Sequence, residues 1–296
     1  MNKNYSLLLL ALGYCFCSTA QQIKESKLKE ERERIIEEWK SQVNVDCNND
    51  YQNKTIHLNN VTMPFHSTTI GKEMRGKRSL WILLNSGEGL TETELQKTIS
   101  SSSSEGIYIK PIIQNKEMWN QPISDTLIEN LIEMMIVKEG VNPNKVYIEN
   151  RSDTHIAERL SDHWATTIPN IANIADCTKT SREPYPKHIV WKQGELARST
   201  VYWDSLTKAI SPKQRDTFEA KIEGNNIEII QMDYDEVTIW INEKMVDLKK
   251  PVTIKYNDKV IYNDIVKLNT SNLILSLENR KDPTFCFPAN VTIRKK

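Results

Sequence analysis

The stretch Lys145-Val-Tyr-Ile-Glu-Asn-Arg-Ser-Asp-Thr-His155 decides the fold. Its β-branched and aromatic residues Val146–Ile148 follow the turn residues Asn142-Pro143-Asn144, which predicts a buried strand entered from a turn. A polar segment and then a helical pattern follow this strand. A strand, a tight turn and a helix in succession are typical of an α/β layer, and Ser152 lies in the turn.

The composition is that of an ordinary globular protein. The chain has 296 residues, of which 39% are hydrophobic and 26% charged. Lysine plus arginine and aspartate plus glutamate both number 39. This balance gives no support to binding of nucleic acid or of an anionic membrane surface.

Residues 1–20 have the pattern of a secretory signal peptide. Lys3 precedes an apolar run from Leu7 to Tyr14, and the small residues Ser18-Thr-Ala20 stand before Gln21. This apolar run is too short to span a bilayer and no other stretch is longer, so we expect no membrane span. The sequence therefore predicts an exported protein, periplasmic or extracellular.

Three cysteines remain after removal of the signal peptide, namely Cys47, Cys177 and Cys286. Their wide spacing is unlike that of metal ligands, and the sequence indicates no metal and no cofactor. One disulfide with a spare thiol and three buried thiols are both open alternatives, and the pairing is not fixed by the sequence.

The N-terminal half predicts further elements of the same layer. Residues 21–43 form an amphipathic helix, which either covers the main domain or docks a partner. The Asn44–Gly71 segment suits edge strands, with His57 and His66 as functional or packing residues. Leu80–Leu84 and Gly106–Ile113 are strands, and Thr126–Lys138 is a helix ended by Gly140. Together they predict a doubly wound α/β sheet.

The pattern changes from Pro184 onward to short strands at regular intervals. This predicts a small all-β, sandwich-like domain over residues 184–296. The aromatic residues there form either a carbohydrate-binding surface or, as is more common, the core of the sandwich. Two turns are expected, at Asn225-Asn226 and at Asn257-Asp258. The expected strands are Ile189–Lys192, Ser199–Trp203, Thr217–Ile222, Ile227–Ile230, Val237–Ile241, Val252–Tyr256, Val260–Tyr262 and Leu273–Leu277.

Several runs resemble exported α/β-hydrolases of the esterase and peptidase type. They are Met63-Pro-Phe-His-Ser-Thr68, Leu80-Trp-Ile-Leu-Leu-Asn-Ser-Gly-Glu-Gly89, Leu131–Val146 and Asp162-His-Trp-Ala165, and later Pro186–Gln193, Val246–Thr253 and Lys281-Asp-Pro283. The resemblance implies an internally truncated hydrolase-like domain at residues 44–183. It also implies that Ser152 is the nucleophile and that Gly87 and Gly89 belong to the oxyanion loop.

The catalytic centre departs from the family pattern. Asn150 and Thr154 stand where the G-x-S-x-G elbow has glycines, and Thr154 is β-branched. Glu88 brings a negative charge near the expected oxyanion. As an alternative to a nucleophile, Ser152 belongs to a polar cluster that caps the helix after it.

The expected acid and base partners have no clear counterpart. They should follow Ser152 in the order acid, then histidine. However, the chain passes from Ile174–Cys177 almost directly to Pro184–Trp191, so the segment that carries them in the family is missing. His155 and His188 are the weak base candidates that remain, and the nearby acids are Asp153, Asp162 and Asp176.

The sequence therefore indicates an exported α/β-hydrolase-like protein whose hydrolytic activity is lost or much reduced. A binding role for a small ester, peptide or glycan is compatible with this scaffold. The alternative is an active serine esterase or peptidase that uses Ser152.

Overall fold

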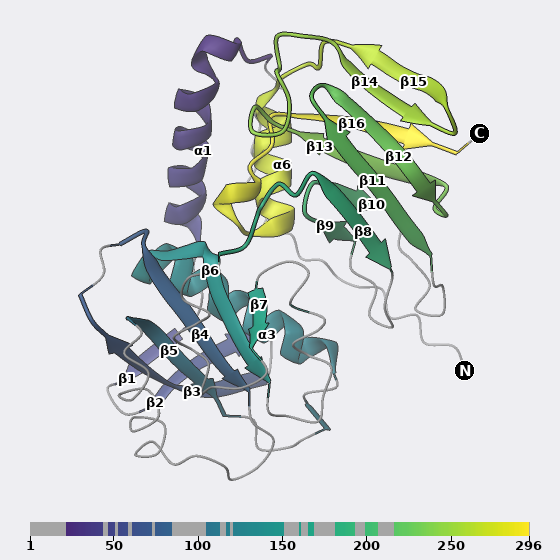
Figure 1. The fold of residues 1–296 in the computed structure, drawn as a ribbon. Helices are drawn as coiled ribbons and strands as arrows, with labels where there is room; N and C mark the ends of the chain where they lie inside the picture. The colour runs from purple at the N-terminus through teal and green to yellow at the C-terminus, as the bar shows by residue number, and fades with distance from the viewer. Residues whose placement is uncertain are drawn as a thin grey trace, which may run out of the picture.

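The computed structural model describes residues 22–43, 47–50, 53–58, 61–72, 75–84, 105–112, 117–118, 121–150, 160, 165–168, 181–192, 199–206 and 216–295. They form a mixed α/β structure with three sheets. Figure 1 shows two lobes, each with its own hydrophobic core. The first lobe contains β1 to β7 and α3, and the second lobe contains β8 to β16 and α6.

One seven-stranded sheet forms the first lobe, in the order β1-β2-β3-β5-β4-β6-β7. The first three strands and β5 pair antiparallel, whereas β5, β4, β6 and β7 run parallel to one another. The predicted strands of this half are confirmed. Their bounds are Cys47–Asp50 (β1), Asn53–Leu58 (β2), Val61–Ile70 (β3), Arg78–Leu84 (β4), Gly106–Pro111 (β5), Val141–Asn150 (β6) and Ala165–Ile168 (β7).

Helix α3 covers one face of this sheet. It spans Pro122–Met134 and continues as a π-type turn, η3, over Met135–Glu139, which ends at Gly140 with φ 68°. The predicted helix and its glycine end are thus confirmed. The apolar side of α3, with Leu127 and Leu131, packs in one core with Leu80 and Ile82 of β4.

The opposite face of the same sheet is buried as well. It carries a stack of three aromatic rings, in which Trp81 lies 5.8 Å from Tyr108 and 4.3 Å from Tyr147 between ring centroids. All three side chains are fully buried. The central strands therefore have apolar side chains on both faces, which explains why Leu80–Leu84 shows no alternation.

Two sheets build the second lobe, in the orders β15-β14-β12-β11-β8 and β16-β13-β10-β9. Their buried side chains contribute to a single core. The strands are His188–Lys192 (β8), Thr200–Val201 (β9), Asp204–Leu206 (β10), Thr217–Glu223 (β11), Asn226–Met232 (β12), Glu236–Ile241 (β13), Val252–Tyr256 (β14), Lys259–Asp264 (β15) and Ala289–Arg294 (β16). A short 3-10 turn, η5, spans Pro283–Phe285.

The prediction of an all-β C-terminal region is wrong in one element. Residues predicted as the strand Leu273–Leu277 lie inside helix α6, which spans Thr270–Arg280. The side chain of Asn269 caps this helix by accepting from the Asn272 amide, and Leu273 and Leu277 are buried one helical turn apart. A short apolar run fits both a buried strand and a helix, so its period alone did not decide.

Only one of the two predicted turns has positive φ at the residues that the sequence indicated. Asn257 and Asp258 both have positive φ, 50° and 59°, as expected for a two-residue hairpin turn between β14 and β15. At the turn predicted for Asn225-Asn226, however, the residue with positive φ is Gly224, at 58°. Tyr202, with φ 47°, interrupts the strand predicted for Ser199–Trp203.

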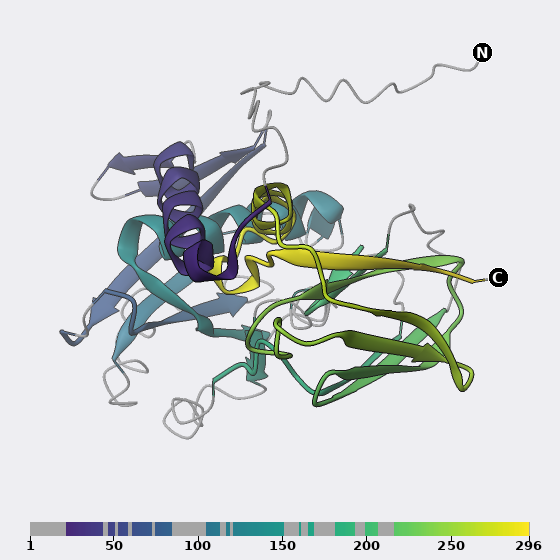
Figure 2. The same cartoon turned by 90° about the horizontal axis from the view of Figure 1, so that it is seen from above.

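The tryptophans of the second lobe are core residues. Trp191, Trp203 and Trp240 are 4%, 0% and 3% exposed, so the alternative of a carbohydrate-binding surface built from them loses its basis. Helix α1, over Leu28–Gln42, belongs to the same core through Leu28 and Ile35. Figure 2 shows it running alongside the second lobe near α6. Within the described part of the chain, no helix has the length and apolar character needed to cross a membrane.

Candidate functional site

The parallel strands of the first lobe bring their carboxyl ends to one edge of the sheet. Leu84, the last residue of β4, is paired with Asn150, the last residue of β6. Glu149 is in turn paired with Ile168, the last residue of β7. In open α/β sheets, ligands bind outside the carboxyl ends of parallel strands, so this edge is the candidate site.

Most of the predicted catalytic residues follow these strand ends in the sequence. Ser152 comes two residues after Asn150 and His155 three residues later, while Gly87 and Gly89 come soon after Leu84. All four lie outside the described residues. Their roles as nucleophile, base and oxyanion loop therefore stay predictions.

His188, the other base candidate, belongs to a different sheet. It begins β8 in the second lobe, and its side chain is exposed. Its Nε2 lies 2.9 Å from Oε1 of Glu219 on the neighbouring strand β11. Glu219 thus holds the His188 ring on the surface of the five-stranded sheet, whereas Ser152 follows a strand of the first lobe.

Three titratable side chains share one sheet face at the candidate edge. His66 on β3 is paired with Lys110 on β5, one position before the last residue of that strand. Glu149 on β6 is paired with Leu83, which lies on the same face as Trp81. The aromatic stack occupies the next row of this face, two residues further back along each strand.

The spacing of the strands limits what these three residues can do together. Neighbouring strands lie about 4.8 Å apart, so His66 and Glu149, three strands apart, are separated by roughly 14 Å. They cannot hydrogen-bond to each other as members of a catalytic triad do. His66 and Lys110, which are both partly exposed, can however contact different parts of one polar ligand.

Glu149 is the residue of this group that the sequence analysis missed. It is only 3% exposed, although it is charged and lies on a central strand. The signal was its position, since a carboxylate directly follows the apolar run Val146–Ile148 just before the strand ends. Lys110 follows Ile107–Ile109 in the same way, and was likewise missed.

The described residues contain no cluster of three or more His, Cys, Asp or Glu side chains suited to a metal ion. The candidate site therefore consists of hydrogen-bonding and charged side chains at a sheet edge.

Comparison with known proteins finds no matching family model, no matching curated protein and no matching solved structure.

Proposed function

We propose that the chain is an exported, internally truncated α/β-hydrolase-like protein that binds a small ester or peptide and hydrolyses it slowly or not at all. The observation that carries the proposal is the position of β6. It lies inside a parallel set of strands, between β4 and β7, and it ends two residues before Ser152. A strand of this kind leads into the nucleophile elbow of α/β-hydrolases.

Reduced activity follows from the partners that Ser152 needs. A serine hydroxyl is a weak nucleophile unless a positioned base takes its proton. Of the three histidines in the described residues, His188 is held by Glu219 in the other lobe, while His66 on β3 and His57 on β2 lie three and four strands away from β6. Thr154, which stands where the family has a small glycine, would also crowd the turn expected to present the hydroxyl.

A binding role is supported by the chemistry of the edge. The partly exposed Lys110 and His66 lie on one face of the sheet at this edge, beside the buried Glu149, and such polar side chains can orient a peptide or a polar ester. The buried aromatic stack occupies the next row of the same face, so these side chains mark the point where the face changes from apolar to polar.

The test is labelling of the purified mature protein with a fluorophosphonate probe, followed by mass mapping of the modified residue. We expect no modification of Ser152, and equal hydrolysis of p-nitrophenyl acetate by the wild type and Ser152→Ala. A cooperative urea transition would show that both proteins are folded. Stoichiometric labelling at Ser152, absent from Ser152→Ala, would overturn the proposal in favour of an active serine esterase or peptidase.

A further inference from the structure

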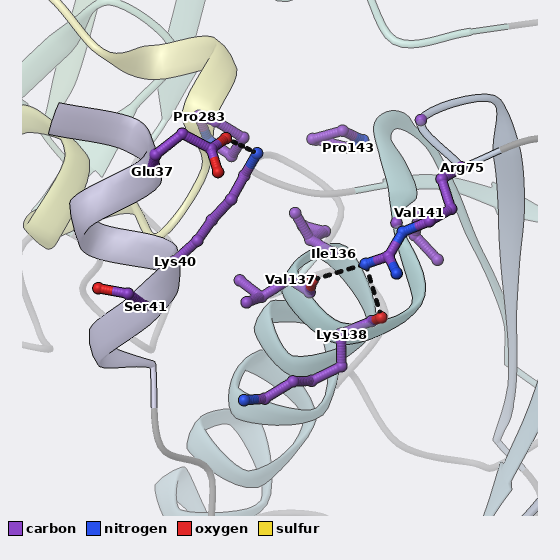
Figure 3. Close-up of a pocket in the computed structure, with 12 residues that line it drawn as sticks. Glu37, Lys40, Ser41, Arg75, Ile136, Val137, Lys138, Val141, Pro143 and Pro283 are labelled. Atoms are coloured by element: carbon purple, nitrogen blue, oxygen red, sulfur yellow. Dashed lines mark hydrogen bonds and ion pairs between the residues drawn. The ribbon is translucent and has the colours of Figure 1, made fainter. Parts of the chain in front are cut away.

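A cavity of about 770 Å³ opens between helix α1 and the end of η3. Figure 3 shows α1 on one side of it and the turn that connects η3 to β6 on the other. The α1 wall belongs to the core of the second lobe, whereas Ile136 and Val141 belong to the core of the first. The cavity is therefore built by both lobes, and its size falls within the range of small-molecule sites.

The cavity lies away from the candidate edge. Val141, one of its lining residues, begins β6, whereas Ser152 follows the end of that strand. A ten-residue strand is about 33 Å long, so a ligand in this cavity is a different ligand from one at the edge.

The charged side chains that line the cavity are mostly cationic. They are Lys40 on α1, Arg75 and Lys138 on the first lobe, and one carboxylate, Glu37. Three positive charges and one negative charge leave a net charge of +2. A cavity with this excess attracts an anion.

The cations differ in how they are engaged. The Arg75 Nη2 lies 2.9 Å from the Lys138 carbonyl oxygen and 3.4 Å from that of Val137, so Arg75 serves to cap the end of η3. Lys40 Nζ lies 2.6 Å from Glu37 Oε1. The side chain of Lys138 extends toward α1 in Figure 3. Lys40 and Lys138 therefore place positive charges on opposite walls, with the Lys40 ammonium pointing toward Pro283 and the Lys138 ammonium away from it in Figure 3.

The remaining lining is largely apolar, with Ile136, Val137, Val141, Pro143 and Pro283. Such walls suit a hydrocarbon body and offer little to a bare phosphate ion. We propose that this cavity binds a small organic carboxylate with an apolar body, and that the positive charges of Lys40 and Lys138 on its two walls attract the carboxylate.

The test is isothermal titration of the full mature protein with octanoate. Each pairing of an ammonium with a carboxylate at a partly exposed site is worth up to about 1 kcal/mol, which corresponds to roughly fivefold in Kd. We expect Lys40→Gln and Lys138→Gln each to weaken binding by about this factor. Glu37→Gln should tighten it, because Glu37 competes with the ligand for Lys40.

Two controls make the result specific. Lys29→Gln removes a highly exposed lysine of the same helix, paired only loosely with Glu33 at 3.9 Å, and should leave the Kd unchanged. Octanamide, which has the same chain without the charge, should bind more weakly than octanoate. The proposal is overturned if octanoate does not bind, if the Lys40 and Lys138 variants match Lys29→Gln, or if inorganic phosphate binds as tightly as octanoate.

Discussion

A buried ion pair lies where the two lobes meet, and its removal should strongly destabilise the protein. Arg182 lies before β8, and its Nη2 is 2.5 Å from Oδ2 of Asp282, just after α6. The same guanidinium donates to Oδ1 of Asn144 on β6, at 2.9 Å from Nη2 and 3.2 Å from Nε. One side chain thus connects the central strand of the first lobe to the second.

The expected magnitude follows from what each substitution leaves behind. The side chains of Arg182 and Asp282 are 5% and 0% exposed. Arg182→Met leaves the Asp282 carboxylate buried without its ion-pair partner; Thr284 still donates to Oδ1 through its amide and hydroxyl, and the buried Arg280 still interacts with the carboxylate electrostatically. Breaking a buried pair in this way costs about 3–5 kcal/mol of unfolding free energy.

The partner substitution separates charge from packing. Asp282→Asn keeps the oxygen that accepts from Thr284 but removes the counter-ion of Arg182. The double variant, Arg182→Met with Asp282→Asn, buries no unpaired charge and should be more stable than either single variant. We therefore expect a coupling free energy of about 2 kcal/mol or more in the double-mutant cycle.

Urea denaturation followed by tryptophan fluorescence and circular dichroism measures these free energies. The matched control is Arg34→Met on α1, where an exposed arginine pairs with Glu31 and Glu38, and its loss should cost about 0.5 kcal/mol or less. A cost below about 1 kcal/mol for Arg182→Met, or a double variant whose losses simply add, would refute the reasoning.

Two further predictions concern buried titratable groups of the second lobe. Burial raises the pKa of Asp204 well above its usual range, with Arg280 opposing. The stability that protonated Asp204 contributes is therefore fully present below its unfolded pKa of about 3.9, and it is lost as pH rises toward its folded pKa. Asp204→Asn removes this titration, so the fall in unfolding free energy between pH 4 and 8 should be smaller in this variant than in the wild type. Burial also raises the pKa of the Cys286 thiol to about 12. Iodoacetamide at pH 8 should modify Cys286 only after unfolding, and rapid modification of the native protein, mapped by mass spectrometry, would contradict its burial.

The elements that the sequence predicted well are those in which local pattern and tertiary burial agree. Leu80–Leu84 is apolar at every position, because Leu80 and Ile82 face the core with α3 while Trp81 stacks on the opposite face. The helix Thr126–Lys138 shows a clear apolar stripe and ends at a glycine with positive φ. In both cases the order of apolar and polar residues along the segment matches the order of buried and exposed side chains in the structure.

The elements that the sequence predicted poorly depend on contacts between distant segments. The run Leu273–Leu277 carries no decisive period, and α6 is fixed by its cap at Asn269 and by Arg280, whose Nη2 donates to the Asp204 carbonyl oxygen 76 residues away. Helix α1 likewise packs with the second lobe, which follows it in the sequence only after the whole first lobe. An amphipathic pattern predicts that one face of a helix is buried, but it does not predict which segment of the chain covers that face.

The candidate edge shows the same limit for function. The sequence located the strand end before Ser152, but only strand register reveals that His66, Lys110 and Glu149 share one face. Glu149 breaks the apolar pattern of β6 just before the strand ends, and its side chain is only 3% exposed and interacts with other groups of the chain. Strand register thus adds to the sequence a set of candidate contact positions, at the end of the parallel strands where ligands bind in open α/β sheets.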